Sequence, residues 1–139
     1  MENAVRHSRV VVLIDHNIEW QATLLWSALR SEGWLELYPL EMVMFNDVGL
    51  AHDSNDRDVW RFAQKSRMIL LTANRNMEGK HSLEKTIREE NTPASLPVLT
   101  ISQEVRLRER EYRTRCAERL LEIVFDIENY LGIGRIFIP

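Results

Sequence analysis

Three clusters of polar side chains hold the residue types that could do chemistry in this chain of 139 residues. Asp15-His16-Asn17 and Asn74-Arg75-Asn76 each follow a short apolar run. The third cluster lies between them in the sequence and consists of Asp53, Asp56 and Asp58. Carboxylates held close together repel one another and persist mainly where a cation compensates them, and oxygen ligands suit Mg²⁺ or Mn²⁺ rather than zinc. The clusters therefore indicate a site for one of these ions, if the fold brings them together.

The segments around these clusters alternate between two hydrophobic periodicities. Apolar runs typical of strands buried on both faces occupy residues 9–14, 41–45, 68–72 and 96–101. Helical spacing occupies residues 18–29, 55–65, 82–90 and 103–131. Residues 34–38 also fit a strand, but Pro39 separates them from residues 41–45, and we take the second run as the sheet strand and residues 46–54 as a loop.

The alternation of strand and helix predicts the fold class. We expect an α/β protein with a three-layer α/β/α arrangement, a four- or five-stranded and mainly parallel sheet, and a single domain over residues 1–139. In such open sheets ligands bind outside the carboxyl ends of the strands. The three polar clusters should therefore converge on one edge of the sheet, with strand 9–14 central.

Composition narrows the class of protein further. The chain is 45% hydrophobic and 28% charged, which predicts a folded domain rather than a disordered one, and Cys116 has no second cysteine with which to form a disulfide. We predict a cytoplasmic protein, because the chain has a lone thiol and residues 1–9 lack the pattern of a signal peptide. We also predict that it does not enter a membrane, because every apolar run is too short to span one. A net charge of -3 argues against nucleic-acid binding driven by overall charge, so any nucleic acid must be held by a local basic patch.

The order of three motifs resembles the PIN-like domains, in particular a small PIN-like group of unknown function related to toxin-type ribonucleases. The motifs are VVLIDHN near the start, SNDRDVWRFA in the middle and MILLTANRN after it, and the resemblance covers residues 9–90. In that group a strand ends in Asp, an acidic residue opens a helix that closes with Ala, and a further strand ends Thr-x-Asp-x-Asp. Asp15 matches the first acidic position, Asp56 the helix-opening one, and Asn74 and Asn76 the last pair.

The resemblance implies a PIN-like fold and hydrolysis of single-stranded RNA that depends on Mg²⁺ or Mn²⁺, in a setting of the toxin–antitoxin type with a cognate protein partner. It implies four catalytic residues, Asp15, Asp56, Asn74 and Asn76, and three metal ligands, Asp15, Asp56 and Asn74. Two of these positions depart from the family, because amides stand where it has carboxylates. An Asn oxygen can bind Mg²⁺ but adds no formal charge, so the metal should be held weakly and hydrolysis should be slow. Two functions stay open: a weak ribonuclease, and a non-catalytic PIN-like module that binds RNA or protein.

Each candidate also has a purely structural explanation. Asn17 can cap the following helix while Asp15 accepts backbone N–H bonds. Asp56 in the first turn of a helix interacts favourably with the helix dipole. Asn74 and Asn76 suit the backbone conformations of turns.

The sequence argues against a general-base role for His16 and against a receiver-like domain. His16 stands beside Asp15 without a partner visible in the sequence, which favours a surface or packing role over that of a general base. A receiver-like phosphoacceptor domain would need adjacent acids after the first strand, where this chain has His16, and a phosphoacceptor Asp and a Lys at later strand ends.

Apolar residues outside the expected core predict self-association. The chain has four tryptophans, Trp20, Trp26, Trp34 and Trp60, and an apolar tail, Ile136-Phe137-Ile138. Together with the long final helix they provide more apolar surface than one small domain can hide, and such patches usually mark a partner. We therefore expect a homodimer.

Overall fold

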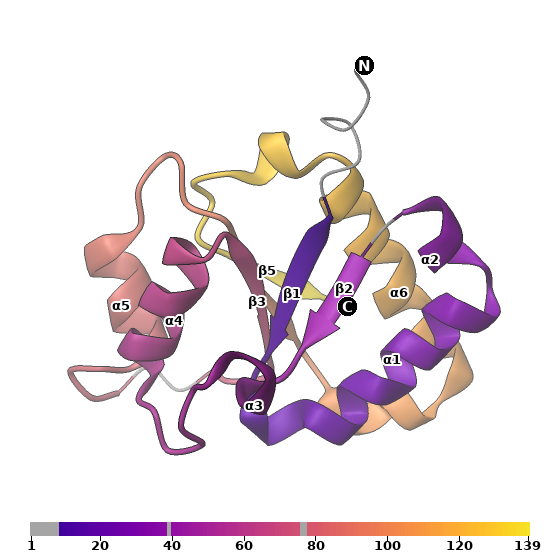
Figure 1. Cartoon of the computed structure of the whole chain (residues 1–139), viewed down its shortest axis with the longest axis horizontal. Helices are drawn as coiled ribbons and strands as arrows, with labels where there is room; N and C mark the ends of the chain where they lie inside the picture. The colour runs from indigo at the N-terminus through magenta and orange to yellow at the C-terminus, as the bar shows by residue number, and fades with distance from the viewer. Residues whose placement is uncertain (1–8, 39, 76–77) are drawn as a thin grey trace.

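The computed structural model describes residues 9–38, 40–75 and 78–139 and has three layers (Figure 1). The middle layer is one sheet of parallel strands in the order β2-β1-β3-β4-β5. The strands are β1 (Val10–Ile14), β2 (Leu40–Val43), β3 (Met68–Thr72), β4 (Val98–Ile101) and β5 (Arg135–Ile138). The predicted α/β class with a parallel sheet between helices is confirmed, with five strands, and β1 lies inside the sheet between β2 and β3.

Helices cover both faces of the sheet. The helices are α1 (Glu19–Ser31), α2 (Trp34–Leu37), α3 (Phe45–Val48), α4 (Asp56–Lys65), α5 (Leu83–Glu90) and α6 (Arg110–Phe125), with short 3-10 turns η2 (His16–Ile18), η3 (Glu104–Arg108) and η4 (Ile127–Tyr130). In Figure 1 α4 and α5 cover the left-hand face, while α1 and α6 cover the right-hand one. Among the described residues, no helix combines the length and the apolar content that crossing a bilayer requires.

Both faces of the sheet are buried, and this explains why the sequences of the strands are continuous apolar runs. Val12 and Ile14 point into the core beneath α1 and α6, while Leu13 between them points into a second core beneath α4 and α5. Each residue of such a strand therefore gains from burial, whichever face it points to. The two cores also separate two of the tryptophans, since Trp26 lies in the first core and Trp60 in the second, whereas Trp20 is half exposed.

The segment between α1 and α4 differs from its predicted structure. Residues 34–37 form α2, which begins directly after Gly33, a residue with the positive φ of +79° that a helix end commonly uses. The strand β2 ends two residues earlier than predicted, because α3 begins at Phe45, the last residue of the expected strand, and runs into the expected loop. The carboxylate of Asp47 accepts the backbone N–H of Met44 (2.8 Å) and so holds the first turn of α3. Pro39 lies outside the described residues.

The continuous helix predicted over residues 103–131 is wrong. It is divided into η3, α6 and η4, with an extended residue, Glu109, before α6. Two side chains of α6 fold the first part back onto the helix. Arg113 donates to the carbonyls of Leu107 (2.7 Å) and Arg108 (3.1 Å), and the hydroxyl of Tyr112 accepts the N–H of Gln103 (3.0 Å). The break places Leu107 fully in the core, which a straight helix would not do.

The apolar tail was interpreted as a docking surface, and this is wrong for two of its three residues. Ile136 and Ile138 are buried as part of β5, which pairs with β4 in the register Leu99 to Ile136 and Ile101 to Ile138. The turn before β5 requires glycine, because Gly132 has φ +83° and an added Cβ would lie 3.0 Å from the backbone of Pro93. Phe137, on the other face of β5, stays exposed.

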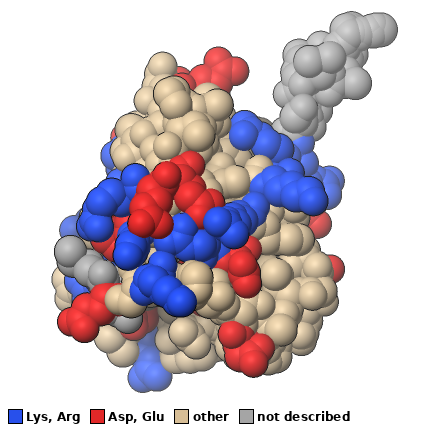
Figure 2. Space-filling model, turned by 90° about the vertical axis from the view of Figure 1, so that its left-hand side faces the viewer, with Lys and Arg blue, Asp and Glu red and all other residues tan. Residues whose placement is uncertain are grey.

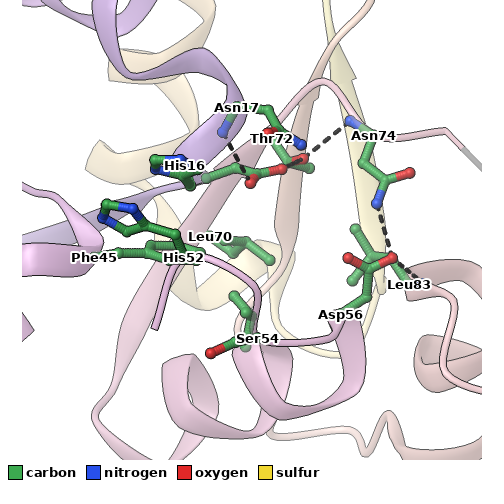
Figure 3. Close-up of a pocket in the computed structure, with 12 residues that line it drawn as sticks. His16, Asn17, Phe45, His52, Ser54, Asp56, Leu70, Thr72, Asn74 and Leu83 are labelled. Carbon is green, nitrogen blue, oxygen red and sulfur yellow. Dashed lines mark hydrogen bonds between the residues drawn. The ribbon is translucent and has the colours of Figure 1, made fainter. Parts of the chain in front are cut away.

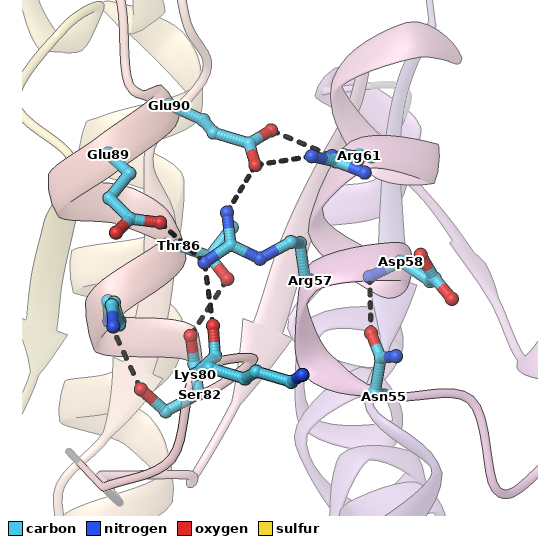
Figure 4. A network of polar contacts seen from close by, with 10 residues as sticks. Asn55, Arg57, Asp58, Arg61, Lys80, Ser82, Thr86, Glu89 and Glu90 are labelled. Atoms are coloured by element: carbon cyan, nitrogen blue, oxygen red, sulfur yellow. Dashed lines mark hydrogen bonds and ion pairs between the residues drawn. The ribbon is translucent and has the colours of Figure 1, made fainter.

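An ion-pair network joins α4 to α5 (Figure 4). The guanidinium of Arg57 is largely buried, donates to the carbonyl of Lys80 (2.8 Å) and to Glu89 (2.7 Å), and pairs with Glu90. Hydrogen bonds from Arg61 and then from Arg57 lower the pKa of Glu90 to about 2, so its carboxylate is charged at neutral pH. Figure 2 shows this face of the molecule, where basic and acidic side chains interleave rather than form a patch of one sign.

The assignment of β5 can be tested with two neighbouring residues. Ile138 is 0% exposed and Phe137 is 51% exposed. Ile138→Ala should lower the free energy of unfolding by about 2–5 kcal/mol, because it leaves a cavity in the core. Phe137→Ala should lower the free energy of unfolding clearly less than Ile138→Ala does, because the ring that it removes is half exposed. Urea unfolding measures both changes, and equal losses would contradict this placement of the tail.

Candidate functional site

A small cavity opens at the carboxyl ends of β1 and β3 (Figure 3). Its volume is about 60 Å³, which suits an ion or a few waters rather than a nucleobase. Asp15, Asp56 and Asn74 all line it, so the three segments predicted to converge do meet there. After β1 the chain passes to β2 on one side and then to β3 on the other, and such a switch point is where open α/β sheets bind ligands.

Two of the other predicted residues lie outside the cavity, and one cannot be placed. Asn76 is outside the described residues. Asp53 and Asp58 are exposed and are not among the residues that line the cavity. The backbone N–H of Asp58 is capped by the side chain of Asn55 (2.8 Å), which is a helix-capping contact.

Asp15 is fixed by the pairing of β1 with β3. Its backbone N–H donates to the carbonyl of Leu71 (2.9 Å), which continues the ladder of the sheet. One carboxylate oxygen accepts the hydroxyl of Thr72 (2.6 Å), and the other accepts the backbone N–H of Asn17 (3.3 Å). Asp15 itself therefore caps η2, the role that the structural explanation gave to Asn17.

Asp56 connects two segments that follow β3. It is the first residue of α4, and its Oδ2 accepts the side-chain amide of Asn74 (2.8 Å) and the backbone N–H of Leu83 (3.2 Å). The carboxylate thus does more than interact with the dipole of α4. It ties the end of β3 to the beginning of α5.

Asn74 completes a chain of hydrogen bonds between the two carboxylates. Its backbone N–H donates to the hydroxyl of Thr72 (2.9 Å), which donates in turn to Asp15. Its side-chain Nδ2 donates to Asp56. Position 74 therefore places a hydrogen-bond donor, rather than a third acid, facing Asp56.

Two histidines form one wall of the cavity, and the sequence did not reveal their pairing. The rings of His16 and His52 stack with centroids 3.9 Å apart, and Figure 3 shows them on the side opposite Asn74 and Asp56. His16 Nδ1 lies 3.4 Å from the carboxylate of Glu19, and His52 Nε2 lies 3.0 Å from Oδ1 of Asn46. No spacing in the sequence connects His16 to His52, because the fold of residues 44–54 alone brings them together.

Glu104 is a further acidic residue that sequence reasoning missed. It lines a more open hollow of about 310 Å³, which shares Asp15 and Asn74 with the small cavity. Glu104 lies in the segment predicted to be the final helix, where it is one of many charged residues. Its position just after the fourth strand was the available signal, because that is again a carboxyl end of the sheet.

The donor set fits a hard cation held weakly. Among the described residues there is no group of three or more His, Cys, Asp or Glu side chains arranged to hold a metal. Asp15 and Asp56 supply carboxylate oxygens, and Asn74 supplies an amide. A half-turn of that amide would bring Oδ1 to the place of Nδ2, and it would break the hydrogen bond from Nδ2 to Asp56. Two charged ligands and one neutral ligand suit weak binding of Mg²⁺ or Mn²⁺.

Comparison with known proteins gave no match. No family model, no curated protein and no solved structure matches this chain. The geometry of the cavity and the order of the three motifs are the observations from which a function can be inferred.

The amide at position 74 makes the charge of the site testable. Asn74→Asp removes the donor to Asp56 and adds a third carboxylate, so without divalent cations the free energy of unfolding should fall by about 1–3 kcal/mol. Mn²⁺ should bind this variant about tenfold more tightly than wild type, because a full negative charge is added. Thermal unfolding with and without Mn²⁺ and titration calorimetry measure the two effects.

A matched control exists on the surface. The side-chain amide of Asn129 donates to Asp126 (2.7 Å) in the same way, but both residues are exposed. Asn129→Asp should change stability little and should leave Mn²⁺ binding as in wild type. An equal response to Mn²⁺ in the two variants would show that the cavity contributes nothing beyond an added charge.

Proposed function

We propose that this chain is a PIN-like protein of the ribonuclease type whose charge-depleted site holds Mg²⁺ or Mn²⁺ weakly and hydrolyses single-stranded RNA slowly. The observation that carries the proposal is that Asp15, Asp56 and Asn74, from three separate segments, line one small cavity at a switch point of a parallel sheet. The order of the motifs VVLIDHN, SNDRDVWRFA and MILLTANRN supports it. The departure at Asn74 and Asn76 supports the low affinity for the ion.

Asp15 and Asp56 would hold the ion, with Oδ1 of Asn74 as a third oxygen after the amide turns. When bound, Mg²⁺ or Mn²⁺ offsets charge on the scissile phosphate and lowers the pKa of water. The rest is done by side chains of this chain. Thr72 orients the Asp15 carboxylate, and the N–H of Leu83 orients that of Asp56. The wider hollow beside the cavity gives the RNA backbone room to approach Asp15.

The stacked histidines, His16 and His52, could transfer a proton in this hydrolysis. An imidazole can accept or donate a proton near neutral pH, and His16 and His52 line the same cavity as the two carboxylates. Nδ1 of His16 contacts Glu19 and Nε2 of His52 contacts Asn46. The proton would therefore move through the other nitrogen of the ring. We propose that, as a water oxygen bonds to phosphorus and the bond from phosphorus to the leaving oxygen breaks, one of the two histidines as an imidazolium gives its proton to that oxygen. The neutral imidazole then regains a proton from solvent, into which the attacking water has released one.

A second function, a non-catalytic PIN-like module that binds RNA or protein, is favoured by one observation. The chain of hydrogen bonds from Asp15 through Thr72 and Asn74 to Asp56 gives both carboxylates donors from the protein itself. A site built in this way keeps its shape without a cation. Such a site can keep a binding surface after losing catalysis.

Cleavage assays distinguish the two functions. With a labelled single-stranded RNA and Mn²⁺, wild type should cut slowly, Asn74→Asp about tenfold faster because it binds the ion more tightly, and Asp15→Asn not at all. Asn129→Asp serves as the control and should match wild type. Tighter Mn²⁺ binding by Asn74→Asp without cleavage by any variant would contradict the ribonuclease and favour the binding module.

The remaining proposals concern setting and partners. We propose a cytoplasmic protein of the toxin–antitoxin type with a cognate protein partner, as the resemblance implies. We also propose a homodimer. An apolar surface supports the dimer. Phe125 is 72% exposed, its ring packs edge-on against that of Tyr38 with the centroids 5.5 Å apart, and the half-buried Trp34 lines the same hollow.

The dimer can be tested with one substitution on this surface and one away from it. Light scattering at micromolar concentration should give twice the chain mass of 16.4 kDa. Phe125→Glu should return the mass to that of a monomer, because it places a charge in the apolar contact. Phe137→Glu on β5 should leave the dimer intact. A wild-type mass of 16.4 kDa would contradict the proposal.

A further inference from the structure

Arg135 is a buried cation that the proposed chemistry does not use. It is the first residue of β5, and its side chain is 9% exposed. The guanidinium donates to the backbone carbonyl of Asn74 (2.7 Å) and to the hydroxyl of Thr100 (2.7 Å). Its Nη2 lies 3.4 Å from the carboxylate of Glu84, at an angle that makes an ion pair without a hydrogen bond.

A positive charge in this place needs an explanation. Arg135 and Thr100 lie on the face of the sheet that α4 and α5 cover, where the neighbouring strands supply the apolar Leu70 and Val98. Burying a guanidinium is costly, and well-packed apolar side chains of similar volume are often at least as stable. Burial accordingly lowers the pKa of Arg135 from its ordinary value, although the group stays protonated. Stability alone therefore does not account for the residue.

The contacts of Arg135 and Asp56 are parallel. Asp56 accepts hydrogen bonds from the side chain of Asn74 and from the N–H of Leu83, the first residue of α5. Arg135 donates to the carbonyl of Asn74 and pairs with Glu84, the second residue of α5. Asp56 and Arg135 thus both join the segment at Asn74 to the beginning of α5. Asp56 binds the side chain of Asn74, and Arg135 binds its backbone carbonyl.

We propose that Arg135 is a positioning residue of the site with two effects. By holding the carbonyl of Asn74, it directs the amide of that residue onto Asp56. By placing a positive charge beside the acidic cavity, it lowers the affinity of the site for a divalent cation. The second effect rests on the proposed function, whereas the first does not.

Lysine at this position separates the two effects. Nη1 of Arg135 donates to both Asn74 and Thr100 while Nη2 faces Glu84. A lysine ammonium keeps the charge but has one nitrogen, which cannot reproduce this two-armed geometry. Arg135→Met removes the charge and the donors together. Arg113→Met is the control, because Arg113 also donates to two backbone carbonyls, those of Leu107 and Arg108, on a different part of the molecule.

Two measurements report on the two effects. Hydrogen exchange of the Asn74 side-chain amide, assigned in NMR spectra by its loss in Asn74→Asp, reports on the bond to Asp56. Titration calorimetry with Mn²⁺ reports on the charge. Arg135→Met should speed the exchange about tenfold and tighten Mn²⁺ binding about tenfold. Arg135→Lys should speed the exchange but keep Mn²⁺ binding near wild type, and Arg113→Met should change neither.

The outcomes that overturn each effect differ. Unchanged exchange of the Asn74 amide in Arg135→Met and Arg135→Lys would overturn the positioning role. Mn²⁺ binding that Arg135→Met leaves unchanged would overturn the charge effect. If Mn²⁺ binds no variant while the amide loses protection, the proposed function and the charge effect fail together and the positioning role is supported.

A further variant keeps the inference testable if Arg135→Met does not fold. Glu84→Gln leaves the donors of Arg135 to Asn74 and Thr100 in place but removes the carboxylate that partly neutralises its charge. Mn²⁺ binding should then weaken severalfold, with the exchange of the Asn74 amide unchanged. Tighter Mn²⁺ binding in Glu84→Gln would overturn the charge effect.

Discussion

The parallel pairing of β1 with β3 is the constraint on which the site depends. In this register Ile14 lies beside Leu71, so the residue that follows β1 reaches the last residue of β3, and the carboxylate of Asp15 meets the hydroxyl of Thr72. A shift by one residue would move every side chain of the strand from one core into the other, where the packing is different, and this holds the register. The apolar residues of two strands thus determine where a polar contact forms.

Charge compensation is the second constraint, and this chain meets it mainly with hydrogen bonds. Two carboxylates near one cavity would repel each other, yet Asp15 and Asp56 each accept donors from the neighbouring backbone and side chains. An amide at position 74 serves such an arrangement better than a third acid, because it donates where an acid could only accept. The same substitution that weakens a metal site therefore strengthens the site without metal.

The sequence predicted what local pattern determines and missed what depends on distant contacts. The strands that precede Asp15 and Asn74 and the bounds of α4 follow from periodicity and residue type, and their prediction was correct to within a few residues. The stacking of His52 on His16 and the reach of Arg135 to Asn74 depend on segments 36 and 61 residues apart. The strand β5 was missed because its three apolar residues follow two glycines and resemble a frayed end, and only pairing with β4 makes them a strand.

Arg135 and a bound metal ion would compensate the same acidic groups in different ways. A guanidinium is covalently attached to the protein and has hydrogen-bond donors only. It can therefore hold the carbonyl of Asn74 and stabilise the acidic cavity, but it cannot coordinate a water molecule beside a phosphate as a metal ion does. A divalent ion has coordination positions left over for water and substrate, and it leaves when its ligands are too few. A buried arginine therefore preserves the shape of the site and not its chemistry. Under the proposed function, the shape of the site would depend on Arg135 and its catalytic power on a separate cation, the bound metal ion.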